Sequence, residues 1–178
     1  MNLGDAAKRA FALQDYSPEA AIPGVEIVDL KRFADDGGAL IELGRLTAGA
    51  HAAFRGFEVK QVNYTEMDPG VIKAFHLHRR QTDVWFVPPG DRMLLVLLDA
   101  RAGSPTENAA RRLILGDASS RLVRIPPGVA HGVRNLASTR GRIIYFVDTH
   151  FSADPDTSDE GRLPWDYAGA DIWEPARG

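Results

Sequence analysis

Short apolar segments, each bounded by glycine, proline or other turn residues, recur along the whole chain. These segments are rich in Val, Ile, Leu and aromatic residues, a composition that favours β-strands. The pattern predicts strands at residues 24–30, 39–46, 60–66, 71–78, 83–87, 93–99, 111–115, 122–125, 132–135 and 142–148. Because the strands follow one another without a long intervening helix, we expect an all-β sandwich or barrel.

The two ends of the chain differ from this pattern. Between residues 3 and 14 the apolar side chains favour one face of a helix, which predicts a short N-terminal helix. Residues 152–178 form a polar, proline-containing tail with two tryptophans. We expect this tail to wrap around the surface by docking Trp165 and Trp173.

Composition limits the size and the partners of the protein. A chain of 178 residues, 44% hydrophobic and 25% charged, buries one core of ordinary size, so we expect a single domain over residues 1–178. The net charge of −3 argues against a nucleic-acid partner. Because the chain has no Cys, it has no disulfide and no thiolate ligand or nucleophile.

Membrane association is also not expected. The longest purely apolar stretch, residues 93–98, is far shorter than the roughly 20 residues that a membrane helix needs. The N-terminus lacks the apolar region of a signal peptide. The sequence therefore predicts a cytoplasmic protein.

Three of the five histidines lie in two short blocks. His76 and His78 belong to GVIKAFHLHRRQTDVWFVPPG at 70–90, which has the layout of the first cupin motif; PPGVAHGVRN at 126–135 matches most of the second and carries His131. Side chains at positions 76 and 78 project from the same face of a strand. The Pro-Pro-Gly turn starts a facing strand, so we expect the three imidazoles to meet inside a cupin jelly-roll barrel.

Two kinds of chemistry use such a cluster. Imidazoles and one carboxylate are ligands for divalent Fe, Mn, Ni or Zn, and the candidate ligands are His76, His78, Asp83 and His131. Alternatively, a buried neutral histidine removes a proton next to a carbonyl group while another residue donates a proton from the opposite face. Tyr145 is the candidate donor, because it shares a strand face with Ile143 and Val147.

Further blocks appear in a fixed order: DDGGALIE at 35–42, QVNYT at 61–65, GVIKAFH at 70–76, DARAGSPT at 99–106, IPPGVAHGV at 125–133, and Tyr145 followed by WDY at 165–167. With these blocks the chain resembles the dTDP-4-dehydrorhamnose 3,5-epimerase family over most of its length. The resemblance implies a jelly-roll cupin that forms a homodimer, acts on a nucleotide-linked 4-keto sugar and requires no cofactor.

The resemblance also assigns roles to residues. It implies that His76 is the general base and Tyr145 the general acid. The implied substrate-binding residues are Glu42, Gln61, Asn63, Lys73, His78 and His131. His78 stands where the family usually has Gln, and a His-x-His at this place also resembles related cupins that isomerise 4-keto sugars to 3-keto sugars.

Several positions depart from the family pattern. Gly37 and Asp83 stand where the family has an Arg and a Lys that contact the diphosphate, and Lys73 stands for another Arg. The candidate replacements are Arg79, Arg80, Arg92, Arg121 and Arg134. The family's C-terminal Asp, which orients the base, has no counterpart, so we expect Asp83 or His78 to orient His76.

Three hypotheses therefore remain open. The first is an epimerase or ketoisomerase that moves protons on a nucleotide-linked 4-keto-6-deoxy sugar, or a similar keto compound, with His76 and Tyr145. The second is a metal-dependent cupin, an oxygenase or isomerase, that uses the three histidines and Asp83. The third is a cupin that binds sugar without catalysis.

Overall fold

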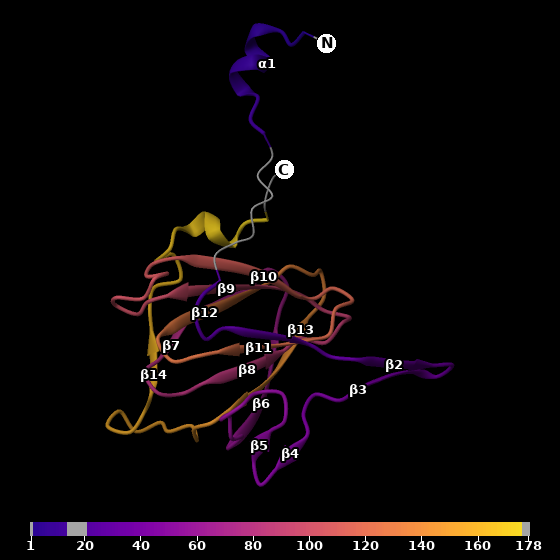
Figure 1. The fold of residues 1–178 in the computed structure, drawn as a ribbon, viewed down its shortest axis with the longest axis vertical. Helices are drawn as coiled ribbons and strands as arrows, with labels where there is room; N and C mark the ends of the chain where they lie inside the picture. The colour runs from indigo at the N-terminus through magenta and orange to yellow at the C-terminus, as the bar shows by residue number, and fades with distance from the viewer. Residues whose placement is uncertain (1, 14–20, 176–178) are drawn as a thin grey trace.

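Antiparallel strands build two five-stranded sheets that pack face to face (Figure 1). The computed structural model describes residues 2–13 and 21–175. The first sheet has the order β1 (Glu26–Asp29), β11 (Arg121–Ile125), β8 (Asp83–Phe86), β13 (Gly141–Val147) and β6 (Gln61–Met67). The second has the order β10 (Ala110–Gly116), β9 (Arg92–Asp99), β12 (Val129–Asn135), β7 (Ile72–His78) and β14 (Glu160–Arg162). This architecture confirms the all-β jelly-roll fold.

Apolar side chains fill the space between the sheets and also cover their outer faces. On β9, Leu95 points into the cluster between the sheets, while Leu94 and Val96 belong to a second cluster on the outer face. Because both faces of this strand are covered, its apolar residues form a continuous run and do not alternate with polar ones. A third cluster, which includes Phe54 and Phe57, covers the outer face of the first sheet.

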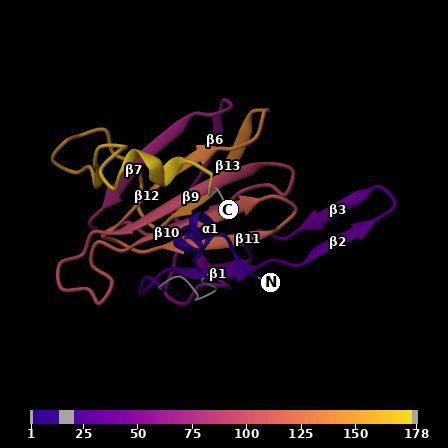
Figure 2. The same cartoon turned by 90° about the horizontal axis from the view of Figure 1, so that it is seen from above.

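The C-terminal tail supplies the cover for the second sheet. It adds β14 at the edge beside β7 and then the 3₁₀ helix η1 (Ala170–Trp173), which lies over this sheet (Figure 2). Trp173 is 0% exposed and packs on Phe75, as expected for a docked side chain. Trp165 is 48% exposed, so its predicted docking is wrong; its backbone carbonyl instead accepts the hydrogen bond of Trp173 Nε1 at 2.8 Å.

Two small hairpins lie between the sheet strands β1 and β6 in the chain. β2 (Arg32–Asp35) pairs with β3 (Gly38–Ile41), and β4 (Leu46–Thr47) pairs with β5 (Ala50–His51). The first hairpin extends away from the sheets in both views (Figures 1 and 2). The single strand predicted at 39–46 is therefore wrong: the chain leaves β3 after Ile41 and enters a separate hairpin at Leu46.

The N-terminal helix α1 (Asp5–Ala10) is shorter than the predicted 3–14, and residue 14 lies outside the described residues. It buries none of its side chains. Within the described residues, no helix is both long enough and apolar enough to cross a membrane.

At two positions of the second histidine block, steric constraints explain why the residue is glycine. Gly128 has φ +78° in the turn before β12, a conformation that costs glycine little. At Gly132, between His131 and Val133, a Cβ atom would lie 2.3 Å from the Cβ of Ala74. The absence of a side chain there lets β12 lie close to β7, which holds His131 beside His76.

Candidate functional site

A cavity of about 600 Å³ lies between the two sheets, and it collects most of the residues singled out in the sequence. Among its lining residues are Gln61, Asn63, Lys73, His76, His78, Asp83, His131 and Tyr145. Glu42 is the exception: it follows β3, and its exposed carboxylate pairs with Arg45 at 2.9 Å. Within this subunit, Glu42 does not line the cavity.

Strand register explains why these side chains meet. On the second sheet, His131 of β12 pairs with His76 of β7, and their rings stack with centroids 6.0 Å apart. On the first sheet, Tyr145 of β13 lies between Asn63 of β6 and Trp85 of β8. Residues paired across antiparallel strands project to the same face, so each register delivers a row of side chains to the cavity.

His76 has a carboxylate partner that the sequence did not reveal. Its Nδ1 lies 3.0 Å from Oε1 of Glu160 on β14. The expectation that Asp83 or His78 orients His76 is therefore wrong. Because an ionised carboxylate only accepts hydrogen bonds, Nδ1 carries the proton and Nε2 keeps its lone pair.

Burial lowers the pKa of His76 to about 4, and electrostatic interactions with His131 and Arg162 act in the same direction. The pKa of Glu160 is also lowered: burial would raise it, but His76 and Arg162 outweigh that effect. At neutral pH the pair is thus a neutral imidazole beside a carboxylate, the form in which His76 can accept a proton.

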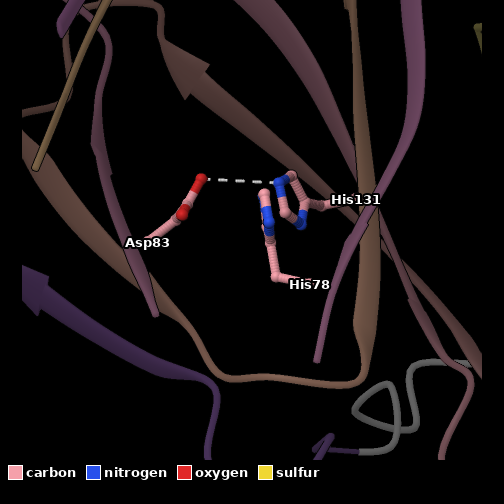
Figure 3. A group of neighbouring side chains, drawn as sticks. All are labelled: His78, Asp83 and His131. Atoms are coloured by element: carbon pink, nitrogen blue, oxygen red, sulfur yellow. Dashed lines mark ion pairs between the residues drawn. The ribbon is translucent and has the colours of Figure 1, made fainter. Parts of the chain in front are cut away.

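A second, more deeply buried group consists of His78, Asp83 and His131 (Figure 3). Nε2 of His131 lies 3.5 Å from Oδ2 of Asp83, which also accepts a hydrogen bond from Trp85 Nε1 at 3.0 Å. Burial would raise the pKa of Asp83, but the contacts with His131, His78 and Trp85 outweigh it and lower the pKa to about 2. Asp83 therefore stays ionised.

The proposed four-residue metal site is only partly assembled. The potential ligand atoms of His78, Asp83 and His131 all lie within 4.8 Å of one another. His76 is not part of this group in the described chain, and its Nδ1 faces Glu160. A metal ion would thus find two imidazoles and one carboxylate, not three imidazoles.

Tyr145 is half-buried on the opposite sheet, with its ring 6.0 Å from that of Trp85. Burial raises the pKa of its phenol, and the negative charges of Asp83 and Glu160 raise it further. The hydroxyl therefore remains protonated at neutral pH and can act as a proton donor.

Cationic side chains at the cavity are Lys73 and Arg162. Lys73 Nζ is held by Thr65 Oγ1 at 3.3 Å and by the Glu66 carbonyl at 3.1 Å. The arginines expected to replace the diphosphate contacts do not line the cavity; these are Arg79, Arg80, Arg92, Arg121 and Arg134. Four of them form ion pairs: Arg80 with Asp159, Arg92 with Asp117, Arg121 with Asp29, and Arg134 with Glu174.

Sequence reasoning missed Glu160, Arg162 and Gln81. The first two lie in a three-residue strand, Glu160–Arg162, whose residues are all exposed, so no hydrophobic period marks it. Gln81 lies between the two motif positions His78 and Asp83, and its amide contacts both. Only its place inside the first histidine block could have drawn attention to it.

Comparison with known proteins shows the family of the chain. Residues 19–172 match the dTDP-4-dehydrorhamnose 3,5-epimerase family. The spore coat polysaccharide biosynthesis protein SpsL of Bacillus subtilis (strain 168) is 41% identical over 145 residues, which cover 82% of this chain and 91% of SpsL. The probable low-salt glycan biosynthesis epimerase Agl13 of Haloferax volcanii is 29% identical over 147 residues, which cover 82% of this chain and 89% of Agl13.

Among solved structures, a dTDP sugar isomerase from Desulfovibrio desulfuricans G20 is similar, with a TM-score of 0.70 and 26% identity over 82% of this chain and 87% of that one. The match to the family spans nearly all of both sheets and includes the three histidines and Tyr145. The protein therefore belongs to the dTDP-4-dehydrorhamnose 3,5-epimerase family, whose members are sugar nucleotide epimerases with the cupin fold.

Proposed function

We propose that the cavity epimerises or isomerises a nucleotide-linked 4-keto-6-deoxy sugar, or a similar keto compound, by proton transfer between His76 and Tyr145. The observation that carries the proposal is the placement of a neutral, carboxylate-paired imidazole on one sheet and a protonated phenol on the other, both lining one cavity. Opposed walls give a bound sugar ring a base on one face and an acid on the other.

In the reaction, His76 Nε2 takes the proton from the carbon next to the keto group. The electrons of the broken C–H bond form a C=C bond, and the negative charge moves to the keto oxygen. Tyr145 then donates its proton to the same carbon from the opposite face, the C=O bond re-forms and the configuration is inverted. The phenolate regains a proton from water and the imidazolium releases one, so neither oxidant nor reductant is needed.

Other lining residues suit the remainder of such a substrate. The amides of Gln61 and Asn63 are joined by a 2.7 Å hydrogen bond and lie beside Tyr145 on the same wall, where they can bind sugar hydroxyls. Lys73 and Arg162 supply positive charge for the diphosphate of a sugar nucleotide. The similarity to a dTDP sugar isomerase supports dTDP as the nucleotide.

The test is solvent exchange. Incubated in D₂O with a dTDP-linked 4-keto-6-deoxy hexose, the protein should replace the proton at C3 or C5 with deuterium and release an epimer or a 3-keto isomer, both visible by NMR. Binding of this sugar without exchange would support the third hypothesis, a non-catalytic sugar-binding cupin, and overturn the proposal.

We also propose that the chain acts as a homodimer. The projecting β2–β3 hairpin carries Phe33, 48% exposed, and Leu40, 67% exposed, on a segment that the rest of the subunit leaves uncovered. Glu42 follows the hairpin, so its implied contact with substrate requires the cavity of a second subunit. Light scattering should give a dimer for the unmodified chain and a smaller species for Leu40→Asp; a monomeric unmodified chain would contradict the proposal.

A further inference from the structure

The buried group of His78, Asp83 and His131 has an arrangement of protons that the proposed reaction does not use. All three side chains are buried, all three line the cavity, and Figure 3 shows them grouped together. Their potential ligand atoms lie within 4.8 Å of one another, which is a distance that one ion can bridge. Whether they can bind an ion depends on which of these atoms carry hydrogen.

Backbone carbonyls determine which ring nitrogen carries the proton in both histidines. Nδ1 of His131 lies 3.2 Å from the Val129 carbonyl oxygen, and Nδ1 of His78 lies 3.3 Å from the Asp159 carbonyl oxygen. A carbonyl oxygen only accepts, so both Nδ1 atoms donate. In a neutral ring the proton is then absent from Nε2, so each Nε2 has a lone pair that points away from the carbonyl and can accept a donor or a cation.

These lone pairs meet other electron-rich atoms. Nε2 of His131 faces the Asp83 carboxylate at 3.5 Å, so two acceptors oppose each other in a buried place unless a positive charge lies between them. Nε2 of His78 faces the Gln81 amide at 3.4 Å, and the same amide donates to Asp83 Oδ1 at 2.8 Å. The Gln81 amide therefore contacts both His78 and Asp83, at the place where one cation would bind both residues.

We infer that His78, Asp83 and His131 bind one divalent transition-metal ion through two imidazole Nε2 atoms and one carboxylate. Two nitrogen ligands favour Zn²⁺, Fe²⁺, Mn²⁺, Co²⁺ or Ni²⁺ over Mg²⁺ and Ca²⁺, which prefer oxygen. The Nδ1–H bonds to carbonyls and the Trp85 bond to Asp83 are the outer contacts that usually orient such ligands.

The inference goes beyond the proposed function and leaves its base in place. His76 is not in the ligand set, because it is not among the described side chains whose ligand atoms all lie within 4.8 Å of one another. Since the three ligands line the cavity, the open positions of the ion would be available to a bound substrate, and the ion would act as a Lewis acid toward a keto oxygen. The competing occupant of the same place is a proton on His131, which would form an ion pair with Asp83.

Cobalt binding tests the inference without any assay of activity. The full chain, first treated with EDTA, is titrated with Co²⁺ while the visible absorption is recorded, and the stoichiometry is checked by calorimetry. We expect one Co²⁺ per chain, displaced by Zn²⁺ and removed by EDTA. If a folded chain binds neither ion, the proton is the occupant and the inference is overturned, whatever the result of the exchange test.

Variants then identify the ligands. His78→Asn, Asp83→Asn and His131→Asn should each weaken Co²⁺ binding by more than about 100-fold, because loss of an outer contact alone costs 10–100-fold. His76→Asn is the matched control, since it removes a histidine two positions away and should change the affinity less than about 3-fold. Equal loss in His76→Asn and His78→Asn would show that this ligand set is wrong. Circular dichroism of each variant confirms folding.

Discussion

The two walls of the cavity carry different chemistry. The wall built from β7, β12 and β14 presents imidazoles together with Glu160 and Arg162, so it holds most of the groups that accept protons or carry charge. The wall built from β6, β8 and β13 presents two amides, an indole and a phenol, with Asp83 as its ionised member. In the proposed reaction, the first wall removes a proton, and the second holds the sugar and returns a proton.

This difference follows from the strand that lies at the edge of each wall. The imidazole wall has the tail strand β14 at its edge, which brings a carboxylate to His76 from 84 residues away in the chain. Within the described residues, β6 is the edge of the phenol wall and has no such added strand beside it. The added edge strand, and not the histidine motif, therefore decides which histidine has a carboxylate partner.

The largest expected effect is the loss of the base. His76→Asn should lower kcat by about 10³-fold, because positioned general bases contribute roughly 10²–10⁴-fold. Deuterium exchange into the substrate should fall by the same factor, since no group remains to remove the proton. The measurement is NMR in D₂O, with a thermal melt to show that the variant folds. Full exchange in His76→Asn would place the base on another residue.

Removal of the acid should distinguish the roles of the two walls. Tyr145→Phe should lower epimer formation by about 10²-fold while deuterium exchange at the reacting carbon persists, because His76 still removes the proton and returns one from the same face. NMR measures both quantities in one experiment. Tyr64→Phe is the matched control, since Tyr64 is the 58%-exposed neighbour of Asn63 on β6. Equal loss of exchange in the Tyr145 and His76 variants would end the distinction between walls.

A smaller effect is expected at the carboxylate behind the base. Glu160→Gln should lower kcat about 10-fold with little change in KM, because it loosens the orientation of His76 without removing it. Glu160→Asp should restore part of the rate. Steady-state kinetics separate kcat from KM. A rise in KM alone would assign Glu160 to substrate binding and leave His76 without an orienting partner.

The smallest effect concerns an amide on the wall that carries Tyr145. Asn63→Ala should raise KM about 3- to 10-fold and leave kcat unchanged, as expected when one hydrogen bond worth about 0.5–1.5 kcal/mol is lost equally from substrate and transition state. Initial-rate kinetics with the same dTDP-linked sugar measure it. A fall in kcat without a change in KM would give Asn63 a part in the chemical step.

Much of the fold could be predicted because burial leaves a local pattern. The strands from β6 to β13 all coincide with segments predicted from their apolar residues. The exposed strands β2 and β14 were not predicted, since pairing with a neighbour and not burial maintains them, and β5, with two residues, is too short to show a pattern. For the same reason the residues on β14 could not be found.

By itself, the sequence determined the jelly roll, the convergence of His76, His78 and His131, and the place of Tyr145 on an inward face, because strand periodicity and turn residues are local properties. Only the tertiary structure decided the partners of these side chains. In the folded chain His76 pairs with Glu160, His78 and His131 lie beside Asp83, and Glu42 lies outside the subunit's own cavity. Those choices depend on which distant strands pair and in which register, a matter of long-range packing that no local pattern records.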